Sequence, residues 1–554
     1  MKLLPRILAD EDELDHQANV ASHERTTEVL ATEQTPLLKR WVAVVTALAL
    51  VPRLGYLFVI SDPENAGQGF TDAYHHWQIA YLTKEIGLSH GPRLWDLKGL
   101  EYFWGLVHPV LMNLLFFGTG SVDIVLARLL SLAAGTFAVV LIFLLCNRYW
   151  GVQVALAASV FAALSPASVF NDDAGMVEPI AIALLLLGIW LTPKRGFWAG
   201  VAWGLAAMAR VEAWLFAAGL VTAWVIGRPS ATLRLPLVAG WALVMGFYVK
   251  FLFDHTGNPI YPLYENFQVV ALGSTEANIV PTPEQQLLRI PLAVIVLVSA
   301  AGLTWALWKR PPSFLLLTYG FGYWVFQAGT LGFTHYLNHS SEWMERRFEF
   351  PLDFAAILVA VALFKYLPRA RVQRPAAWIV SAAALIGMQL FWVPIQQAYA
   401  ATEPSYQHEQ SVGRVIGQAY AGAGRGGAIG VPADQPTLVY TMVRDGGVPG
   451  AQIVSEFYDP FYYLPPGYSY ADHKEIVGPL LQCWLANAHI RLLLIPPASA
   501  FNASVPGYDA FIADNPQWFS DTGVQVDPGF VLVAVRVQAP SPGVCSVAAK
   551  AAPH

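Results

Sequence analysis

The strongest constraint in this sequence is a series of apolar segments long enough to cross a lipid bilayer. A spanning helix needs about 20 mostly apolar residues. Only 13% of the 554 residues are charged, against roughly 25% in an average soluble domain. We therefore expect a polytopic α-helical membrane protein. Eleven segments approach the required length, at 41–60, 122–146, 152–170, 177–192, 197–213, 213–227, 235–253, 289–308, 313–331, 351–365 and 375–397.

The basic residues between these segments predict the orientation of the chain. Positive charge in short loops marks the cytoplasmic side of a membrane. With the N-terminus inside, five inside connections carry Lys or Arg and no acid: Arg148; Lys194 and Arg195; Arg228 and Arg234; Lys309 and Arg310; and Lys365, Arg369, Arg371 and Arg374. Residues 1–38 are polar, contain "ADEDELDH" and lack a signal-peptide core. We expect this segment to be a disordered cytoplasmic tail.

One further apolar stretch, "FWGLVHPVLMNLLFF" at 103–117, is short for a span. Counting it as one would invert every later loop and contradict the charge pattern. It is better interpreted as a helix that lies in the outer interface or re-enters from that side. The first outer loop then covers 61–121, and the transmembrane domain covers 39–397.

The same orientation places residues 398–554 outside the membrane, as a domain large enough to fold on its own. Helical patterns at 408–420 and 474–488 alternate with strand-like runs at 451–457, 490–496 and 530–537, which predicts an extracytoplasmic α/β domain. Cys483 and Cys545 both fall in this domain. Because that compartment is oxidising, we expect them to form a disulfide.

Acidic side chains gather in two of the predicted outer loops. The stretch "TDAYHHWQIAYL" at 71–82 contains Asp72, followed by His75 and His76, and "VFNDDAGMVEPIAI" at 169–182 contains Asp172, Asp173 and Glu178. An acid at the membrane boundary is often simply solvated among the headgroups. A carboxylate that begins a span, as Glu178 does, is costly to desolvate and indicates a functional site.

Arginines occur at the same predicted depth. Arg210 and Glu212, at the outer end of the fifth span, either form an ion pair that closes a turn or present a cation to a lipid phosphate. Arg346 and Arg347 precede the tenth span, near His335 and Glu345. Such arginines often anchor headgroups, but they also bind phosphate through paired hydrogen bonds. The sequence thus predicts acids on one wall of a site and arginines on the other.

These features resemble the GT-C superfamily of membrane glycosyltransferases over residues 41 to about 365. The pattern is similar to the protein O-mannosyltransferase and lipid A aminoarabinose transferase branch, and more distantly to the oligosaccharyltransferase catalytic subunit, whose "WWDYG" signature is absent. The motifs that carry the resemblance are "TDAYHHWQIA", "VDIVLARLLSLAAGTFAVVLIFLLCNRYWG", "NDDAGMVEP", "GLAAMARVEAWL", "DHTGNPIYP" and "ERRFEFPL".

The resemblance implies an inverting glycosyltransferase that takes a sugar from a polyprenyl-phosphate donor. It implies that Asp72 acts as, or orients, the base for the acceptor, that Asp172, Asp173 and Glu178 complete the catalytic site, and that Arg346, Arg347 and Arg210 bind the donor phosphate. His75, His76, Glu212, His335 and Glu345 are expected in supporting roles.

The acceptor is expected to be a glycan, a lipid or a protein at the outer face of the plasma membrane, or of the endoplasmic reticulum in a eukaryote. Asp72, Asp172 and Asp173 are also candidate ligands of a divalent cation, Mg²⁺ or Mn²⁺. The net charge of −6 and the lack of a long basic run argue against a nucleic-acid partner. The alternatives are an oligosaccharyltransferase-like activity, a secondary transporter, and a non-catalytic receptor.

Overall fold

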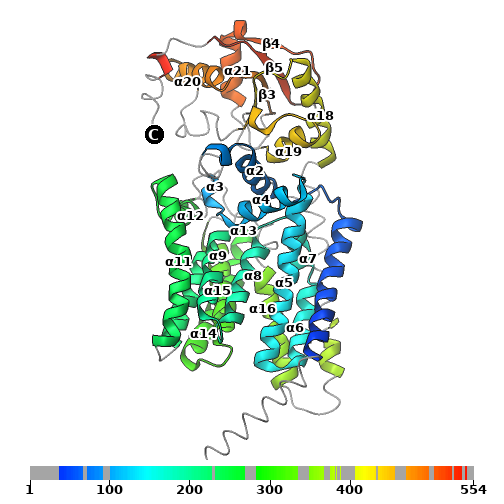
Figure 1. Ribbon diagram of the computed structural model, residues 1–554, viewed down its shortest axis with the longest axis vertical. Helices are drawn as coiled ribbons and strands as arrows, with labels where there is room; N and C mark the ends of the chain where they lie inside the picture. The colour runs from blue at the N-terminus through cyan, green and yellow to red at the C-terminus, as the bar shows by residue number, and fades with distance from the viewer. Residues whose placement is uncertain are drawn as a thin grey trace, which may run out of the picture.

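The structure is a computed structural model in which a bundle of helices carries a smaller α/β domain at one end (Figure 1). Helices α2 and α4 lie between the two parts. The structure describes residues 37–66, 72–90, 100–227, 231–268, 272, 282–334, 349–366, 375–380, 382–383, 387, 406–431, 435–455, 470–497, 505–526, 529–538 and 543–545.

The helices of the bundle coincide closely with the predicted apolar segments. They are Leu37–Ile60, which ends in the π-helical turn η1 (Tyr56–Ile60), α5 (Val125–Trp150), α6 (Val152–Leu164), α7 (Pro166–Asp173), α8 (Glu178–Leu191), α9 (Gly196–Ala209), α10 (Glu212–Gly227), α11 (Ala231–Thr256), α14 (Arg289–Lys309), α15 (Phe314–Phe333) and α16 (Glu349–Val361), followed by η7 (Ala362–Tyr366). Two short helices, α12 (Tyr261–Asn266) and α13 (Pro283–Leu287), lie between α11 and α14.

The described helices support a membrane location. Four of them, Leu37–Ile60, Val125–Trp150, Arg234–Thr256 and Gln285–Lys309, are long and apolar enough to cross a bilayer. Large apolar side chains face outward from the bundle, and Leu297 on α14 is 70% exposed, as expected of a surface covered by lipid. The count of eleven spans stays a prediction, and most of the predicted span 375–397 lies outside the described residues.

The predicted span at 152–170 is wrong as a single helix. It breaks into α6 and α7, which meet at an angle of 56°. Ser165 before the proline is extended, with φ −60° and ψ 122°, because the Pro166 ring disfavours helical backbone at the preceding residue. The break tilts α7, so that Asp172 and Asp173 end a helix instead of lying in a loop.

The predicted first outer loop folds into short helices between Leu37–Ile60 and α5. These are α2 (Asp72–Glu85), η2 (Gly87–His90), α3 (Leu100–Phe103) and α4 (Val107–Thr119). On α4, His108, Met112 and Phe116 are buried, whereas Leu114 and Phe117 are more than 60% exposed. A short helix with an exposed apolar face fits the predicted position in the membrane interface.

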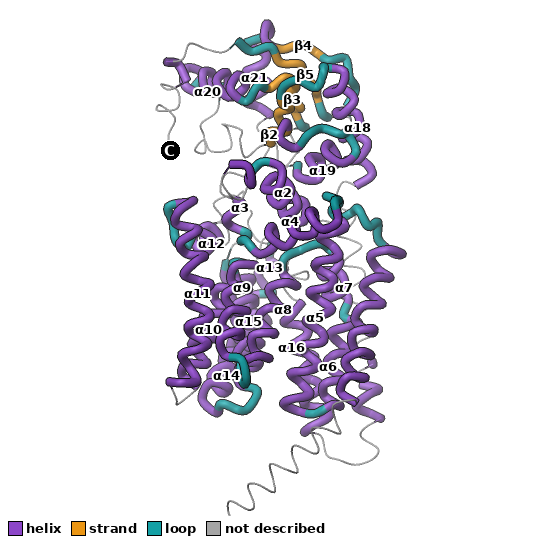
Figure 2. The backbone as a smooth tube through the Cα atoms, viewed as in Figure 1, coloured by secondary structure: helices purple, strands orange, loops and turns teal. Residues whose placement is uncertain are grey.

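The C-terminal α/β domain, residues 406–545, contains one mixed sheet with strand order β2-β1-β3-β5-β4. Strands β2, β1 and β3 run parallel, and β5 and β4 continue the sheet antiparallel. Figure 2 shows this sheet at the end of the molecule far from the bundle. The strands are β1 (Ala428–Val431), β2 (Ile453–Ser455), β3 (Ile490–Ile495), β4 (Phe519–Asp521) and β5 (Val531–Val535).

Helices cover both faces of this sheet, each over its own apolar core. One core contains side chains of α20 (Lys474–Asn487) and α21 (Val505–Asp514), and the other contains side chains of α18 (Tyr406–Gly422) and α19 (Pro436–Arg444). The two predicted helices and the three predicted strands are all present. The sheet therefore has the layered α/β arrangement that the alternating patterns predicted.

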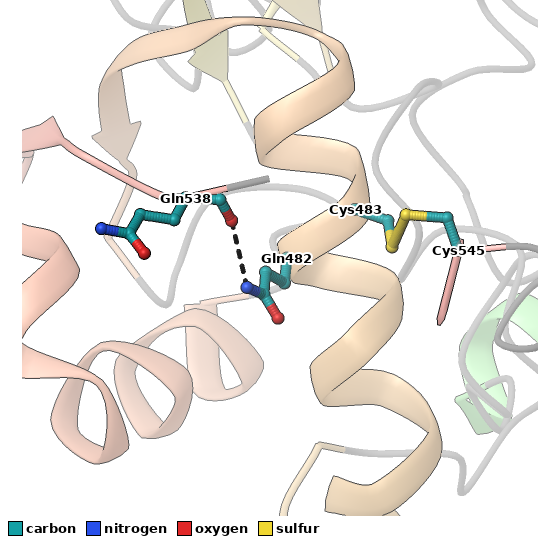
Figure 3. Close-up of a disulfide and its surroundings, with 4 residues drawn as sticks. All are labelled: Gln482, Cys483, Gln538 and Cys545. Carbon is teal, nitrogen blue, oxygen red and sulfur yellow. Dashed lines mark hydrogen bonds between the residues drawn. A yellow bond between two sulfur atoms is a disulfide. The ribbon is translucent and has the colours of Figure 1, made fainter. Parts of the chain in front are cut away.

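The predicted disulfide is confirmed. Cys483 on α20 is bonded to Cys545, with Cα atoms 5.6 Å apart, and Gln482 donates a hydrogen bond of 3.1 Å to the carbonyl oxygen of Gln538 beside it (Figure 3). The crosslink ties the end of the chain to α20 across 62 residues of sequence.

We predict that replacing both Cys483 and Cys545 with Ser destabilises the α/β domain by about 2–4 kcal/mol, because a disulfide restricts the unfolded chain. The measurement is denaturant unfolding of the full chain in detergent, followed by Trp fluorescence. Cys146→Ser is the control, since Cys146 is a free, buried thiol. An unchanged unfolding midpoint in the double variant would contradict the prediction.

Candidate functional site

Asp72 is the first residue of α2 and is partly exposed. The rest of that helix is buried from Ala73 to Thr83, including both histidines. An acid in the first turn is favoured by the helix dipole. The fold thus holds Asp72 at the accessible end of a buried helix, which suits a group that has to meet a substrate.

His76 belongs to a group of rings between α2 and α4. Its ring centroid is 4.9 Å from that of Trp104 and 5.2 Å from that of His108. Burial lowers the pKa of His76 well below its usual value, and the nearby His108 lowers it further, whereas Asp72 raises it. Burial also lowers the pKa of His108, to about 4. Both imidazoles are therefore neutral at neutral pH.

A fully buried ion pair joins the first helix to α7. The Nε and Nη2 atoms of Arg53 both lie 2.6 Å from Oδ2 of Asp172, and both side chains are 0% exposed. Arg53 also donates to the carbonyl oxygens of Ala49 and Ala163. A Cβ atom on Gly135 would fall 1.9 Å from Asp172 Cγ, so glycine is required for this close approach.

Two further acids surround this pair. Glu349 and Asp353 on α16 are buried and lie within electrostatic range of Asp172 and Arg53, and Ser168 donates to Asp353 over 3.2 Å. Arg53, Glu349 and Asp353 were not among the site residues predicted from the sequence. A lone arginine inside the first apolar segment was the available signal, because an ionisable residue in a span is a functional candidate by default.

Asp173 differs from its neighbour. Its carboxylate is buried and accepts no hydrogen bond from the residues that the structure describes. Arg128 donates to the backbone oxygen of Asp173 and to Asp62 and Ser61. Arg128 thereby connects the end of α7 to the segment that follows η1.

Arg210 lies between two of the predicted acids. Its Nη1 atom is 3.0 Å from Glu178 Oε1, and its Nε atom is 2.8 Å from Glu212 Oε2. Arg210 also acts electrostatically on His76, which places the start of α2 near the junction of α9 and α10. We call Asp72, His76, Glu178, Arg210 and Glu212 the polar layer.

An apolar cavity of about 630 Å³ is lined mainly by residues of α4, α5, α8, α9 and α11. Its lining residues Val107, Ile180 and Met208 lie within two positions of His108, Glu178 and Arg210. The full lining comprises Thr83, Leu88, Leu106, Val107, Val110, Leu111, Leu130, Ala133, Ala134, Phe137, Ile180, Ala183, Leu184, Leu205, Met208, Phe247 and Phe251. None of these lining residues carries a charge, and the size and apolar character of the cavity suit a hydrocarbon chain.

The predicted cation site does not fit the residues present. Within the described ranges, no group of three or more His, Cys, Asp or Glu side chains is arranged to hold a metal ion. The carboxylate of Asp172, a predicted ligand, binds Arg53 instead. The predicted phosphate-binding and supporting residues His335, Glu345, Arg346 and Arg347 lie outside the described residues.

The C-terminal α/β domain rests on α2 through α19. Tyr440 is buried with its ring 4.8 Å from Trp77 and 5.5 Å from Tyr74, and its hydroxyl oxygen accepts a hydrogen bond from the Ile124 amide. Gly450 packs so closely on Tyr81 that a Cβ atom would fall 2.2 Å from the ring. The domain thus packs directly against the helix that begins with Asp72.

Charged groups surround this contact. Arg444 of α19 lies 2.7 Å from Glu64 and also binds Asp123, and Tyr406 donates to Glu64 over 2.7 Å. Burial raises the pKa of Asp123, but hydrogen bonds from Arg444 and Ser121 outweigh it, so the pKa lies below its usual value. Asp123 is therefore ionised at neutral pH and pairs with Arg444.

Two solved structures have a similar fold. ArnT from Cupriavidus metallidurans, in the apo state, aligns with a TM-score of 0.54 and 14% identity over 91% of this chain and 99% of ArnT. The apo oligosaccharyltransferase of Archaeoglobus fulgidus aligns with a TM-score of 0.50 and 10% identity over 82% of this chain and 69% of that enzyme. No protein-family model and no curated protein sequence matches.

ArnT and the archaeal oligosaccharyltransferase both belong to the GT-C superfamily. This chain therefore has the fold of the GT-C membrane glycosyltransferases. The resemblance inferred from the sequence is confirmed at the level of the fold.

We predict that Arg53→Met destabilises the bundle by about 3–5 kcal/mol, because it leaves a buried carboxylate without its partner. Adding Asp172→Leu to this variant should restore most of the loss. Denaturant unfolding in detergent measures both. The matched control is Lys250→Met with Asp254→Leu, an exposed pair at 2.7 Å that should contribute less than about 1 kcal/mol. If Arg53→Met and the double variant Arg53→Met/Asp172→Leu lost the same free energy of unfolding, the prediction would be contradicted.

A second prediction concerns Arg444→Glu, which places a third acid beside Glu64 and Asp123. The repulsion should loosen the contact and raise amide exchange in α2 by roughly tenfold, since local opening follows the free energy of local contacts. Hydrogen-exchange mass spectrometry measures this, and Glu64→Arg should partly reverse it. Arg491→Glu, at an exposed position on β3, is the control. Unchanged exchange in the Arg444 variant would show that this charge does not hold the domain.

Proposed function

We propose that this protein is a glycosyltransferase that moves a sugar from a polyprenyl-phosphate donor to an acceptor at the outer face of the membrane. The observation that supports this most directly is the apolar cavity, whose lining residues Val107, Ile180 and Met208 lie within two positions in the sequence of His108, Glu178 and Arg210. A polyprenyl phosphate has the matching chemistry, a long hydrocarbon joined to an anionic head. The fold shared with ArnT and the archaeal oligosaccharyltransferase supports the same class of reaction.

The proposed step is a single displacement at the anomeric carbon of the donor sugar. An acceptor hydroxyl or amine attacks this carbon as its bond to the phosphate oxygen breaks, and the electron pair of that bond leaves with the phosphate. The acceptor proton passes to the Asp72 carboxylate. Because attack occurs opposite the leaving group, the configuration inverts. The partial exposure of Asp72 at the start of α2 supports this role, and a positioned base contributes about 10²–10⁴-fold.

The other acids receive different roles in this proposal. Asp172 and Glu178 already face Arg53 and Arg210, which makes them poor proton acceptors, so we assign them to holding α7 and α8 in place. Asp173 has no such ion pair among the described residues and remains a candidate contact for the acceptor. The charge of Arg210 is offset by two carboxylates. Arg346 and Arg347 are therefore the proposed cations for the departing phosphate.

The membrane acts as the source of the donor. A polyprenyl chain can enter from the bilayer along α4, whose Val110 and Leu111 line the cavity while Leu114 and Phe117 face outward. The partners are thus membrane lipids, the lipid-linked sugar and an acceptor of the lipid, glycan or protein class. Peptides that contain an Asn-x-Ser/Thr sequence, tested beside lipid A, would separate an oligosaccharyltransferase-like reaction from transfer to lipid.

We predict that Asp72→Asn lowers transfer at least ~100-fold without changing expression or thermal stability, since Asn preserves shape but cannot accept the proton. Purified protein is incubated with radiolabelled dolichyl- and undecaprenyl-phosphate mannose and aminoarabinose plus membrane extract, and label in new products is counted. Asp254→Asn, on the exposed end of α11, is the control. Full activity in Asp72→Asn would remove Asp72 as the base, and no transfer by the wild type would refute the proposed function.

A further inference from the structure

Two buried histidines near the polar layer have ring nitrogens that no described residue satisfies. Nε2 of His76 and both ring nitrogens of His108 are buried and have no hydrogen-bond partner in the part of the chain that the structure describes. The side chains are 2% and 1% exposed. Burying a polar atom without a partner costs about 1–3 kcal/mol, so such atoms in a folded protein call for an explanation.

The surroundings of these rings suggest a ligand with hydroxyl groups. A neutral imidazole has one donor and one acceptor nitrogen, which matches a hydroxyl, whereas an anion requires donors alone. Trp104 lies 4.9 Å from His76 and is only partly buried. Aromatic rings together with a few placed polar groups are typical of small-molecule sites.

The position of the two histidines in the chain, relative to the cavity, suggests which part of the donor they would contact. Val107 lines the cavity and is followed in the sequence by His108, whose ring contacts that of His76. Asp72 acts electrostatically on His76, so the two histidines connect the cavity-lining segment with the proposed base. In a polyprenyl-phosphate sugar, the phosphate and then the sugar follow the tail, and the anomeric carbon has to approach the base.

We propose that Trp104, His76 and His108 form the subsite that binds the sugar ring of the donor. Trp104 packs against the C–H face of the ring, and the two imidazoles exchange hydrogen bonds with its hydroxyls. This inference rests on the proposed function. It specifies which residues bind the sugar, as distinct from those that bind the lipid phosphate. Because these histidine nitrogens are buried, binding of the sugar requires the side chains around them to move.

The test separates binding of the sugar from binding of the lipid phosphate. His108→Phe retains a ring of similar shape and removes both nitrogens, and His108→Gln retains a donor and an acceptor. We expect His108→Phe and His76→Phe to lower kcat/KM for the glycosylated donor at least tenfold, while the Kd for undecaprenyl phosphate without a sugar changes less than twofold. His108→Gln should retain more activity than His108→Phe.

Thermal unfolding distinguishes this role from a purely structural one. If His108 were only structural, its replacement would lower the Tm. Removing unsatisfied buried nitrogens should leave the Tm of His108→Phe unchanged or higher. His255→Phe is the control, because that ring contacts Tyr102 outside the cluster. The proposal would be overturned if His108→Phe had a lower Tm and lost affinity equally for the glycosylated donor and for undecaprenyl phosphate. Unchanged transfer in both Phe variants would also overturn it. Failure of the wild type to transfer any sugar would instead refute the proposed function.

Discussion

The structure depends on how ionisable groups are compensated where water is absent. Arg53 and Asp172 are both fully buried, and moving either charge from water into the bundle alone would cost several kcal/mol. Their ion pair joins the first helix to α7, while Arg210 joins the starts of α8 and α10. These ion pairs fix the end of α7 and the starts of α8 and α10. Glu178, Arg210 and Glu212 of the polar layer lie at or next to the latter two helix ends.

The structure also depends on the packing around α2, the helix that begins with Asp72. Helix α2 is too polar to lie in lipid, yet it is buried along nearly its whole length. Helix α4 packs against α2 on one side, and Tyr440 and Gly450 of the α/β domain pack against it on the other. In this arrangement the C-terminal domain contributes to the position of the proposed base as well as standing over the membrane part.

Much of the architecture follows from local patterns that can be read along the chain. Apolar length located the helices to within a few residues, alternation located β3 and β5, and the compartment argument paired Cys483 with Cys545. The prediction failed where one residue changed the backbone, as at Pro166, which splits a segment whose composition is uniformly apolar. The assignment of Asp72 as the base stays a prediction, as do the roles of Arg346 and Arg347.

The sequence by itself determined that this is a chain of membrane helices with an α/β domain, and that its acids gather near particular helix ends. Only the tertiary structure decided which charges meet. Arg53 and Asp172 are 119 residues apart, and Arg444 and Glu64 are 380 apart. Hydropathy and alternation indicate whether each residue along the chain is buried or exposed. Which two charges form an ion pair depends instead on how the helices pack. For the same reason, the contact between His108 and His76 came only from the fold.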